Sequence, residues 1–174
     1  MKKLLVVIDY QNDFISGSLG FSGAAKIGPA IAGKIKQYHE SGDEVIFTMD
    51  THHADYLETY EGRNLPVTHC VKESEGWQVS ADILAESPEE PLTFLKHTFG
   101  SSELFDHLRQ NMYQSVELCG VVTNICVIAN AVLAKTAQPE TPVIVDAKCV
   151  ASNDEELHQK ALDVMKSFQV EVLE

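Results

Sequence analysis

Short apolar runs alternate along the chain with stretches of helical periodicity, and this alternation constrains the fold more than any other feature. The first run, Leu4–Ile8, is apolar at every position, as in a strand that is buried on both faces. Further strands are predicted over residues 44–49, 92–95, 116–118, 142–145 and 170–173. Strands that alternate with helices predict an α/β fold, an open parallel β-sheet flanked by helices on both faces.

The segments between these strands carry apolar side chains at helical spacing. The first helix is predicted from Ile27, Ile31, Ile35 and Tyr38. Pro29 is expected in its first turn and Gly42 just after its end. A second helix is predicted over residues 101–112, and a third from the stripe of Ile125, Ile128, Ala129, Val132 and Leu133. The sequence Ser152-Asn153-Asp154-Glu155 has the form of a capping box before the last helix.

Length and charge restrict the function. A chain of 174 residues favours one domain, residues 1–174. A net charge of −13 without a basic run disfavours binding to nucleic acid or to anionic membranes. We therefore expect a small neutral or cationic partner, and we leave the oligomeric state open, a homo-oligomer included. The first apolar run is too short for a signal or a membrane span, so a cytoplasmic location is expected.

Four cysteines occur, Cys70, Cys119, Cys126 and Cys149, and no two of them form a CxxC pair. A chain of this size needs no disulfide framework, so the four are expected to be thiols in a reducing compartment.

Reactive residues follow several of the predicted strands. Asp9 follows the first strand, Asp50 the second and Lys96 the third, while Cys126 follows the fourth after a short connection that contains glycine. The carboxyl ends of parallel strands meet at one edge of a sheet. Chain topology alone can therefore bring all four residues to the same rim.

Together these residues suit acyl transfer at sulfur. Cys126 is expected one turn inside a helix capped by Thr123, where free amides and a nearby Lys96 favour the thiolate. Asp9 can accept the thiol proton and later deliver it to a leaving group. Each residue also has an alternative role: the cysteine as core filler, the aspartate as a turn residue and the lysine as a solvated charge.

Residues 50–80 form a long polar stretch, which in a compact domain is typical of a functional loop. Asp50 and His52 lie two residues apart, on the same side of an extended segment, and His69 follows later. Two imidazoles and a carboxylate make an open site for a divalent ion such as zinc, manganese or iron(II). His53 is expected to face solvent. Either Glu58 or Glu61 could add an oxygen ligand.

Three segments resemble the motifs of the isochorismatase-like cysteine hydrolases, in matching order and over nearly the whole chain. They are VIDYQNDF at residues 7–14, KHTFGS at 96–101 and GVVTNICV at 120–127. The resemblance implies an open parallel sheet and a catalytic triad of Asp9, Lys96 and Cys126. It also implies a cis peptide before Val122, which aims the amides of Val122 and Cys126 into an oxyanion hole. The cysteine points to the amidase branch of the family.

Within that branch, Asp50, His52 and His69 resemble the metal site of nicotinamidases and pyrazinamidases, where the metal holds a pyridine nitrogen. Phe14 matches the aromatic residue that packs on the substrate ring. Leu65-Pro66 departs from the aromatic-Pro pair that is usual there. The leading hypothesis is thus hydrolysis of nicotinamide, or a close aromatic amide, with a divalent ion, zinc above all. Two alternatives remain: a hydrolase of another small amide, ureido or carbamoyl compound, and a non-catalytic ligand- or metal-binding module.

Overall fold

The computed structural model describes residues 1–87 and 90–174, and its centre is one six-stranded sheet. All five strand pairings are parallel, in the order β3-β2-β1-β4-β5-β6. The strands are β1 (Leu4–Ile8), β2 (Glu44–Asp50), β3 (Leu92–Lys96), β4 (Val116–Val121), β5 (Val143–Ala151) and β6 (Val170–Leu173). The predicted open parallel sheet is confirmed, although β4 and β5 extend further than the sequence indicated.

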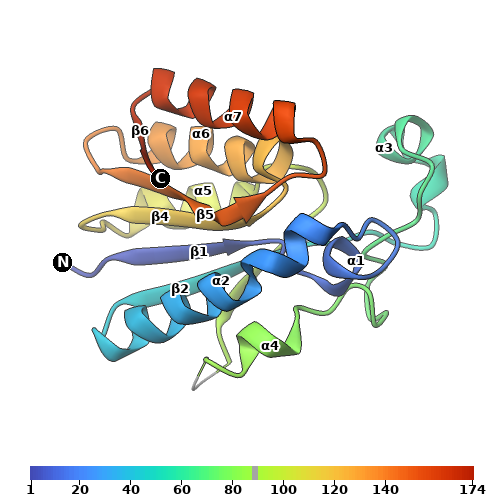
Figure 1. The fold of residues 1–174 in the computed structure, drawn as a ribbon, viewed down its shortest axis with the longest axis horizontal. Coiled ribbons are helices and arrows are strands. Elements are labelled where there is room, and N and C mark those ends of the chain that lie inside the picture. The colour runs from blue at the N-terminus through green and yellow to red at the C-terminus, as the bar shows by residue number, and fades with distance from the viewer. Residues whose placement is uncertain (88–89) are drawn as a thin grey trace.

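Helices cover both faces of the sheet, as Figure 1 shows: α5, α6 and α7 lie on one side, and α2 and α4 on the other. The helices are α1 (Asn12–Ile15), α2 (Ser22–Glu40), α3 (Tyr60–Asn64), α4 (Ala81–Leu84), α5 (Ser102–Gln110), α6 (Ile128–Ala137) and α7 (Glu155–Ser167). Two short turns are also helical, the 3-10 turn η1 (Tyr56–Glu58) and the π-helical turn η2 (Thr123–Val127). Among the described residues, no helix is both long enough and apolar enough to cross a bilayer.

The central strand β1 explains this layered arrangement. Its side chains alternate between two cores: Leu4, Val6 and Ile8 pack into one, while Leu5 and Val7 pack into the other. All five residues are fully buried. A strand that contacts helices on both faces needs apolar residues at every position, which is what the sequence of β1 provides.

Helix α2 begins earlier than predicted. It starts at Ser22, so Pro29 lies inside the helix and not in its first turn. The apolar periodicity is visible only from Ile27, but the buried Ala24 extends the helix toward its N-terminus, and its carbonyl accepts a hydrogen bond of 2.7 Å from Tyr10 Oη. The predicted stop is confirmed: Gly42, at φ 71°, follows the end of the helix.

Two predicted caps are wrong. The residue before η2 is Val122, and Thr123 belongs to the turn, where its hydroxyl bonds with His158 Nδ1 at 2.9 Å. The last helix is capped by Asp154, whose side chain accepts from the Leu157 amide at 2.9 Å. Ser152 bonds instead with the Asn124 side chain at 2.6 Å, so it is not available as the cap.

The stripe predicted for the helix after β4 is also displaced. Ile125 and Val132 are 39% and 46% exposed, whereas Val127, Ala131 and Ala134 are fully buried. The π-helical turn η2 has more residues per turn than an α-helix, so it rotates the buried face away from the one that a regular spacing predicts.

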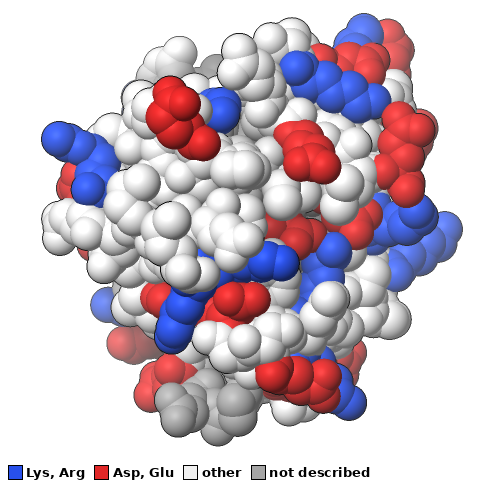
Figure 2. Space-filling model, turned by 90° about the vertical axis from the view of Figure 1, so that its left-hand side faces the viewer, with Lys and Arg blue, Asp and Glu red and all other residues white. Residues whose placement is uncertain are grey.

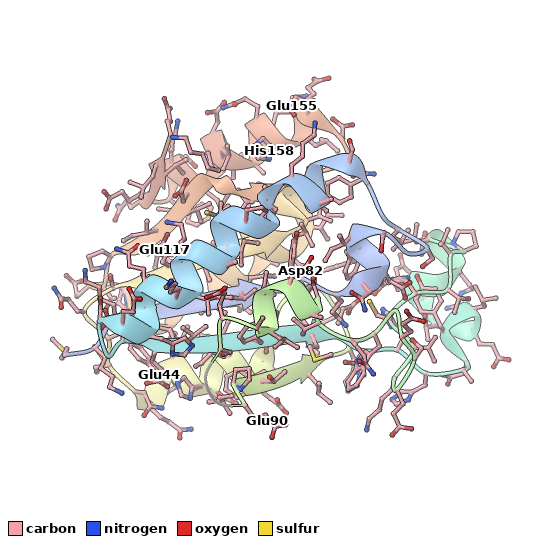
Figure 3. The ribbon with its side chains drawn as sticks, turned by 60° about the horizontal axis from the view of Figure 1, so that its bottom comes forward. Glu44, Asp82, Glu90, Glu117, Glu155 and His158 are labelled. Atoms are coloured by element: carbon pink, nitrogen blue, oxygen red, sulfur yellow. The ribbon has the colours of Figure 1, made fainter. Side chains whose placement is uncertain are left out.

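In the part of the chain that the structure describes, the surface charges form no continuous basic region on the face where the strands begin. Figure 2 shows this face, with Lys and Arg interspersed among Asp and Glu. Near it, Glu117 of β4 lies beside α2 (Figure 3). Its carboxylate pairs with Lys34 Nζ at 2.7 Å and accepts a hydrogen bond from Tyr38 Oη at 2.7 Å. Lys34 also pairs with Asp146 at 2.9 Å, which joins α2 to two strands.

Candidate active site and metal centre

The carboxyl ends of β1, β2 and β3 bring the predicted residues together. Asp9 follows β1 directly, and Asp50 and Lys96 are the last residues of β2 and β3, where they are register partners. Cys126 comes from η2, which follows the neighbouring strand β4. β4 approaches β1 closely at Gly120, where a Cβ atom would collide with the Ile8 carbonyl. This close approach helps to place η2 beside Asp9.

Lys96 is the centre of this cluster. Its Nζ lies 2.6 Å from Asp9 Oδ2, 3.3 Å from Asp50 Oδ1 and 3.5 Å from Cys126 Sγ. It also donates to the Thr98 carbonyl at 3.0 Å, and the residue is only 3% exposed. Burial lowers the pKa of this amine, but the surrounding negative charges outweigh burial and hold the pKa above its ordinary value. Lys96 is therefore a buried cation.

Asp9 is fully buried and has a left-handed backbone, with φ 47°. The Thr48 hydroxyl donates to its Oδ1 at 2.7 Å, while Oδ2 faces Lys96. Burial raises the pKa of this carboxyl above its ordinary value, although the Lys96 charge opposes the shift. A carboxylate with a raised pKa is a better proton acceptor than a solvated one.

Cys126 is 7% exposed and lines a cavity of about 170 Å³. Burial raises the pKa of its thiol, and the charge of Lys96 only partly opposes this effect. Burial thus opposes the thiolate and Lys96 favours it, so the thiolate expected from the sequence stays a prediction. A base that removes the thiol proton assists attack by sulfur, and Asp9 belongs to the same cluster.

Two buried amide side chains hold this site together, and the sequence analysis missed both of them. Asn130 donates to the Cys126 carbonyl at 2.8 Å and to the Phe99 carbonyl at 3.2 Å, so it joins η2 to the loop after Lys96. Gln11 bonds to both the amide and the carbonyl of Asp50, at 2.8 and 2.9 Å. Asn130 could have been found as a polar residue one turn after Cys126 within an apolar helix.

The second cluster lies beside the first and shares Asp50. Its Oδ2 is 3.0 Å from His52 Nε2 and 3.3 Å from His69 Nε2. Glu61 Oε1 lies 3.7 and 3.8 Å from the same two nitrogens. One ligand atom from each of the four residues lies within 4.8 Å of every other. The predicted set of Asp50, His52 and His69 is thus brought together, and Glu61 joins it, whereas Glu58 is exposed.

These donors fit a divalent metal ion. Two imidazole nitrogens and two carboxylates are ligands that borderline ions such as zinc accept. The other nitrogen of His69, Nδ1, bonds to the Val67 carbonyl at 2.7 Å, an arrangement that orients a metal-binding histidine. Hydrogen bonds with the two imidazoles and the charge of Lys96 lower the pKa of Asp50 against the effect of burial. His53 is exposed, as predicted.

Residues 3–174 match the isochorismatase domain family. The chain belongs to the isochorismatase family. The uncharacterized isochorismatase family protein PncA of Bacillus subtilis (strain 168) is 31% identical over 173 residues, which cover 93% of each chain. The pyrazinamidase of Pyrococcus horikoshii in complex with zinc has 28% identity and a TM-score of 0.86, covering 100% of this chain and 99% of its own. N-carbamoylsarcosine amidase from Thermoplasma acidophilum has 27% identity and a TM-score of 0.80, covering 99% and 96%.

In this member of the isochorismatase family the peptide between Val121 and Val122 is cis, as the resemblance implied. Val122 and Phe14 line the same cavity of about 170 Å³ as Cys126. The Phe14 ring also contacts the His69 ring edge-on, with centroids 5.6 Å apart. Asp50, Glu61 and His69 line this cavity too, so one molecule bound there can reach both the sulfur and the metal cluster.

Proposed function

We propose that this protein hydrolyses nicotinamide, or a close small aromatic amide, to the carboxylic acid and ammonia through a thioester on Cys126. The general activity, hydrolysis of an amide bond of unspecified substrate, follows from membership of the isochorismatase family and from similarity to nicotinamidases and pyrazinamidases. One observation carries the proposal: a single small cavity is lined by Cys126 and by Asp50, Glu61 and His69 of the metal cluster. Its apolar walls suit a ring, and its volume suits a small molecule.

The proposed reaction begins with the Cys126 thiol and the Asp9 carboxylate. Sulfur attacks the amide carbon while Asp9 takes the thiol proton, and the Val122 and Cys126 amides stabilise the oxyanion, each by about 3 kcal/mol. The carbon–nitrogen bond then breaks, and Asp9 delivers its proton to the leaving nitrogen to form ammonia. Water attacks the thioester with Asp9 as base, which releases the acid and restores the thiol.

Lys96 holds Asp9 in place through the 2.6 Å ion pair and stabilises negative charge on sulfur from 3.5 Å. A metal held by Asp50, His52, Glu61 and His69 would supply a Lewis acid for the ring nitrogen of the substrate. Phe14, next to His69, is then placed to pack on that ring. The zinc in the Pyrococcus horikoshii pyrazinamidase supports a divalent ion in this chain as well.

A second candidate is hydrolysis of a carbamoyl compound. It is favoured by the similarity to N-carbamoylsarcosine amidase over nearly the whole of both chains. The two candidates differ in their need for the metal cluster, since only a substrate with a ring nitrogen gains from that contact.

Metal removal separates the candidates. We expect chelation to raise KM for nicotinamide by at least about tenfold, because the ring nitrogen loses its partner. Hydrolysis of benzamide, which lacks the ring nitrogen, should change less. The measurement is ammonia release from nicotinamide, benzamide and N-carbamoylsarcosine, before chelation and after readdition of zinc.

His52→Ala should reproduce the chelated enzyme, with metal content falling in parallel. His39→Ala is the matched control, because His39 lies in the last turn of α2, outside the cluster and outside both cavities. Turnover of nicotinamide that His52→Ala leaves unchanged would contradict the nicotinamidase proposal. Turnover of N-carbamoylsarcosine alone would favour the second candidate.

A further inference from the structure

A second, larger cavity adjoins the one that contains Cys126. Its volume is about 880 Å³, against about 170 Å³ for the inner cavity. Four residues line both cavities and form the boundary between them: Glu61 and the apolar Leu65, Phe99 and Ile125. The outer cavity is therefore an extension of the inner one past a rim with three apolar side chains and one carboxylate.

The three apolar side chains of the rim are partly open to solvent. Leu65 is 38% exposed, Phe99 47% and Ile125 39%. Each comes from a different segment of the chain: the end of α3, the loop after β3 and the turn η2. A molecule that passes between the cavities would cover all three, and burying their apolar surface would stabilise its binding.

The residues of the outer cavity show which part of a substrate would reach it. His52 and Glu61 of the metal cluster line it, whereas Cys126 lines only the inner cavity. On the proposed function, the reacting carbonyl lies at Cys126 and the ring nitrogen at the metal cluster. A group in the outer cavity is thus attached to the ring, on the acyl side of the amide, and is not part of the leaving amine.

The outer cavity favours a planar group without negative charge. Tyr60, 80% exposed, lines it together with the rings of His53 and His97, whose centroids are 5.9 Å apart at an angle of 30°. His97 Nδ1 donates to the Thr51 carbonyl at 2.8 Å, which fixes its ring. Asp55 and Glu61 add carboxylates, and of the residues described no Lys or Arg lines this cavity. Such a lining attracts aromatic or cationic groups and repels anions.

We propose that the outer cavity is a second substrate site, which takes a planar, uncharged or cationic substituent on the ring of the amide. This inference rests on the proposed function for the position of the ring. The substrate class is then a ring-substituted aromatic amide that spans both cavities, and nicotinamide itself fills only the inner one.

The test measures binding to metal-loaded Cys126→Ala protein, which cannot turn the amide over, by titration calorimetry. The probes are nicotinamide and two sets of ring-substituted nicotinamides. One set carries a phenyl group on different ring carbons, and the other carries a carboxylate in place of the phenyl group. At least one phenyl compound should bind about tenfold more tightly than nicotinamide, and its carboxylate counterpart more weakly. In the Tyr60→Ala background most of that gain should disappear. Leu57→Ala is the matched control, because Leu57 is 53% exposed on the adjacent turn and lines neither cavity.

The inference is overturned if no phenyl compound binds more tightly than nicotinamide, or if the gain survives Tyr60→Ala. Ammonia release from nicotinamide by the wild-type protein is measured in parallel. Absence of ammonia release from the wild-type protein would contradict the proposed function. The comparison between the phenyl compounds and nicotinamide reports on the outer cavity alone.

Discussion

Replacing Lys96 by methionine tests the buried charge cluster at the centre of the site. Methionine preserves most of the volume but removes the cation that pairs with Asp9 at 2.6 Å and with Asp50 at 3.3 Å. All three residues are at most 4% exposed, so water cannot replace the lost partner. Removing one member of a buried ion pair costs about 3–5 kcal/mol, because the other charge is left uncompensated.

We expect Lys96→Met to lower the free energy of unfolding by about 4 kcal/mol, near the middle of that range. Urea unfolding of metal-free protein, followed by circular dichroism, measures the change. Lys36→Met is the matched control: Lys36 is exposed on α2, so its replacement should cost less than about 0.5 kcal/mol.

A second substitution assigns the cost to the pair itself. Adding Asp9→Asn to Lys96→Met removes one of the uncompensated carboxylates, so the double variant should recover about 1–3 kcal/mol relative to Lys96→Met. A loss below about 1 kcal/mol in the single variant would refute the reasoning. A double variant destabilised by the sum of the two single costs would refute it equally, because the residues would then act independently.

Three further results are expected. Lys96→Met and Asp9→Asn should each lower the steady-state rate of amide hydrolysis by at least about 100-fold. The loss in the double variant should be far smaller than the product of the two single losses, and a loss equal to that product would show that the two residues act independently. Cys126 should be the first cysteine that iodoacetamide alkylates, since it lines a cavity while Cys70, Cys119 and Cys149 are at most 1% exposed. Peptide mass spectrometry measures the order of labelling, and earlier labelling of another cysteine would contradict this expectation. Burial raises the pKa of Asp146, but Lys34 and the Lys148 amide outweigh burial and lower it. Its pairing therefore stabilises the fold above about pH 4, and this stabilisation is lost as pH falls through the lowered pKa. In urea unfolding, the difference in the free energy of unfolding between wild type and Lys34→Met should be larger at pH 7 than at pH 3, and an equal difference at the two pH values would contradict this.

The sequence identified the parts of the fold that depend on local pattern. The fully apolar β1 predicted a strand with helices on both faces, and the strand ends predicted that Asp9, Asp50 and Lys96 would meet, because parallel strands place their carboxyl ends on one edge. These inferences need only the periodicity and order of the elements.

Features that depend on long-range contacts were not predictable in this way. The π-helical turn η2 displaced the buried face of α6, and Asp154 took the capping position because Ser152 bonds with Asn124. Glu61 joined the metal cluster through the fold of α3, whereas nothing in the spacing separated it from Glu58. The burial of Cys126, which raises the pKa of its thiol against the effect of the Lys96 charge, also depends on contacts that are distant in the sequence.

The most direct test of the central claim is ammonia release from nicotinamide by metal-loaded protein, wild type beside Cys126→Ser. Serine is isosteric but a far weaker nucleophile at the same position, so the fold and the metal cluster should be preserved. We expect wild-type protein to release ammonia and nicotinate in equal amounts, and Cys126→Ser to lose at least about 1000-fold in kcat. Activity in Cys126→Ser within about tenfold of wild type would contradict a thioester on this sulfur, and with it the proposed reaction.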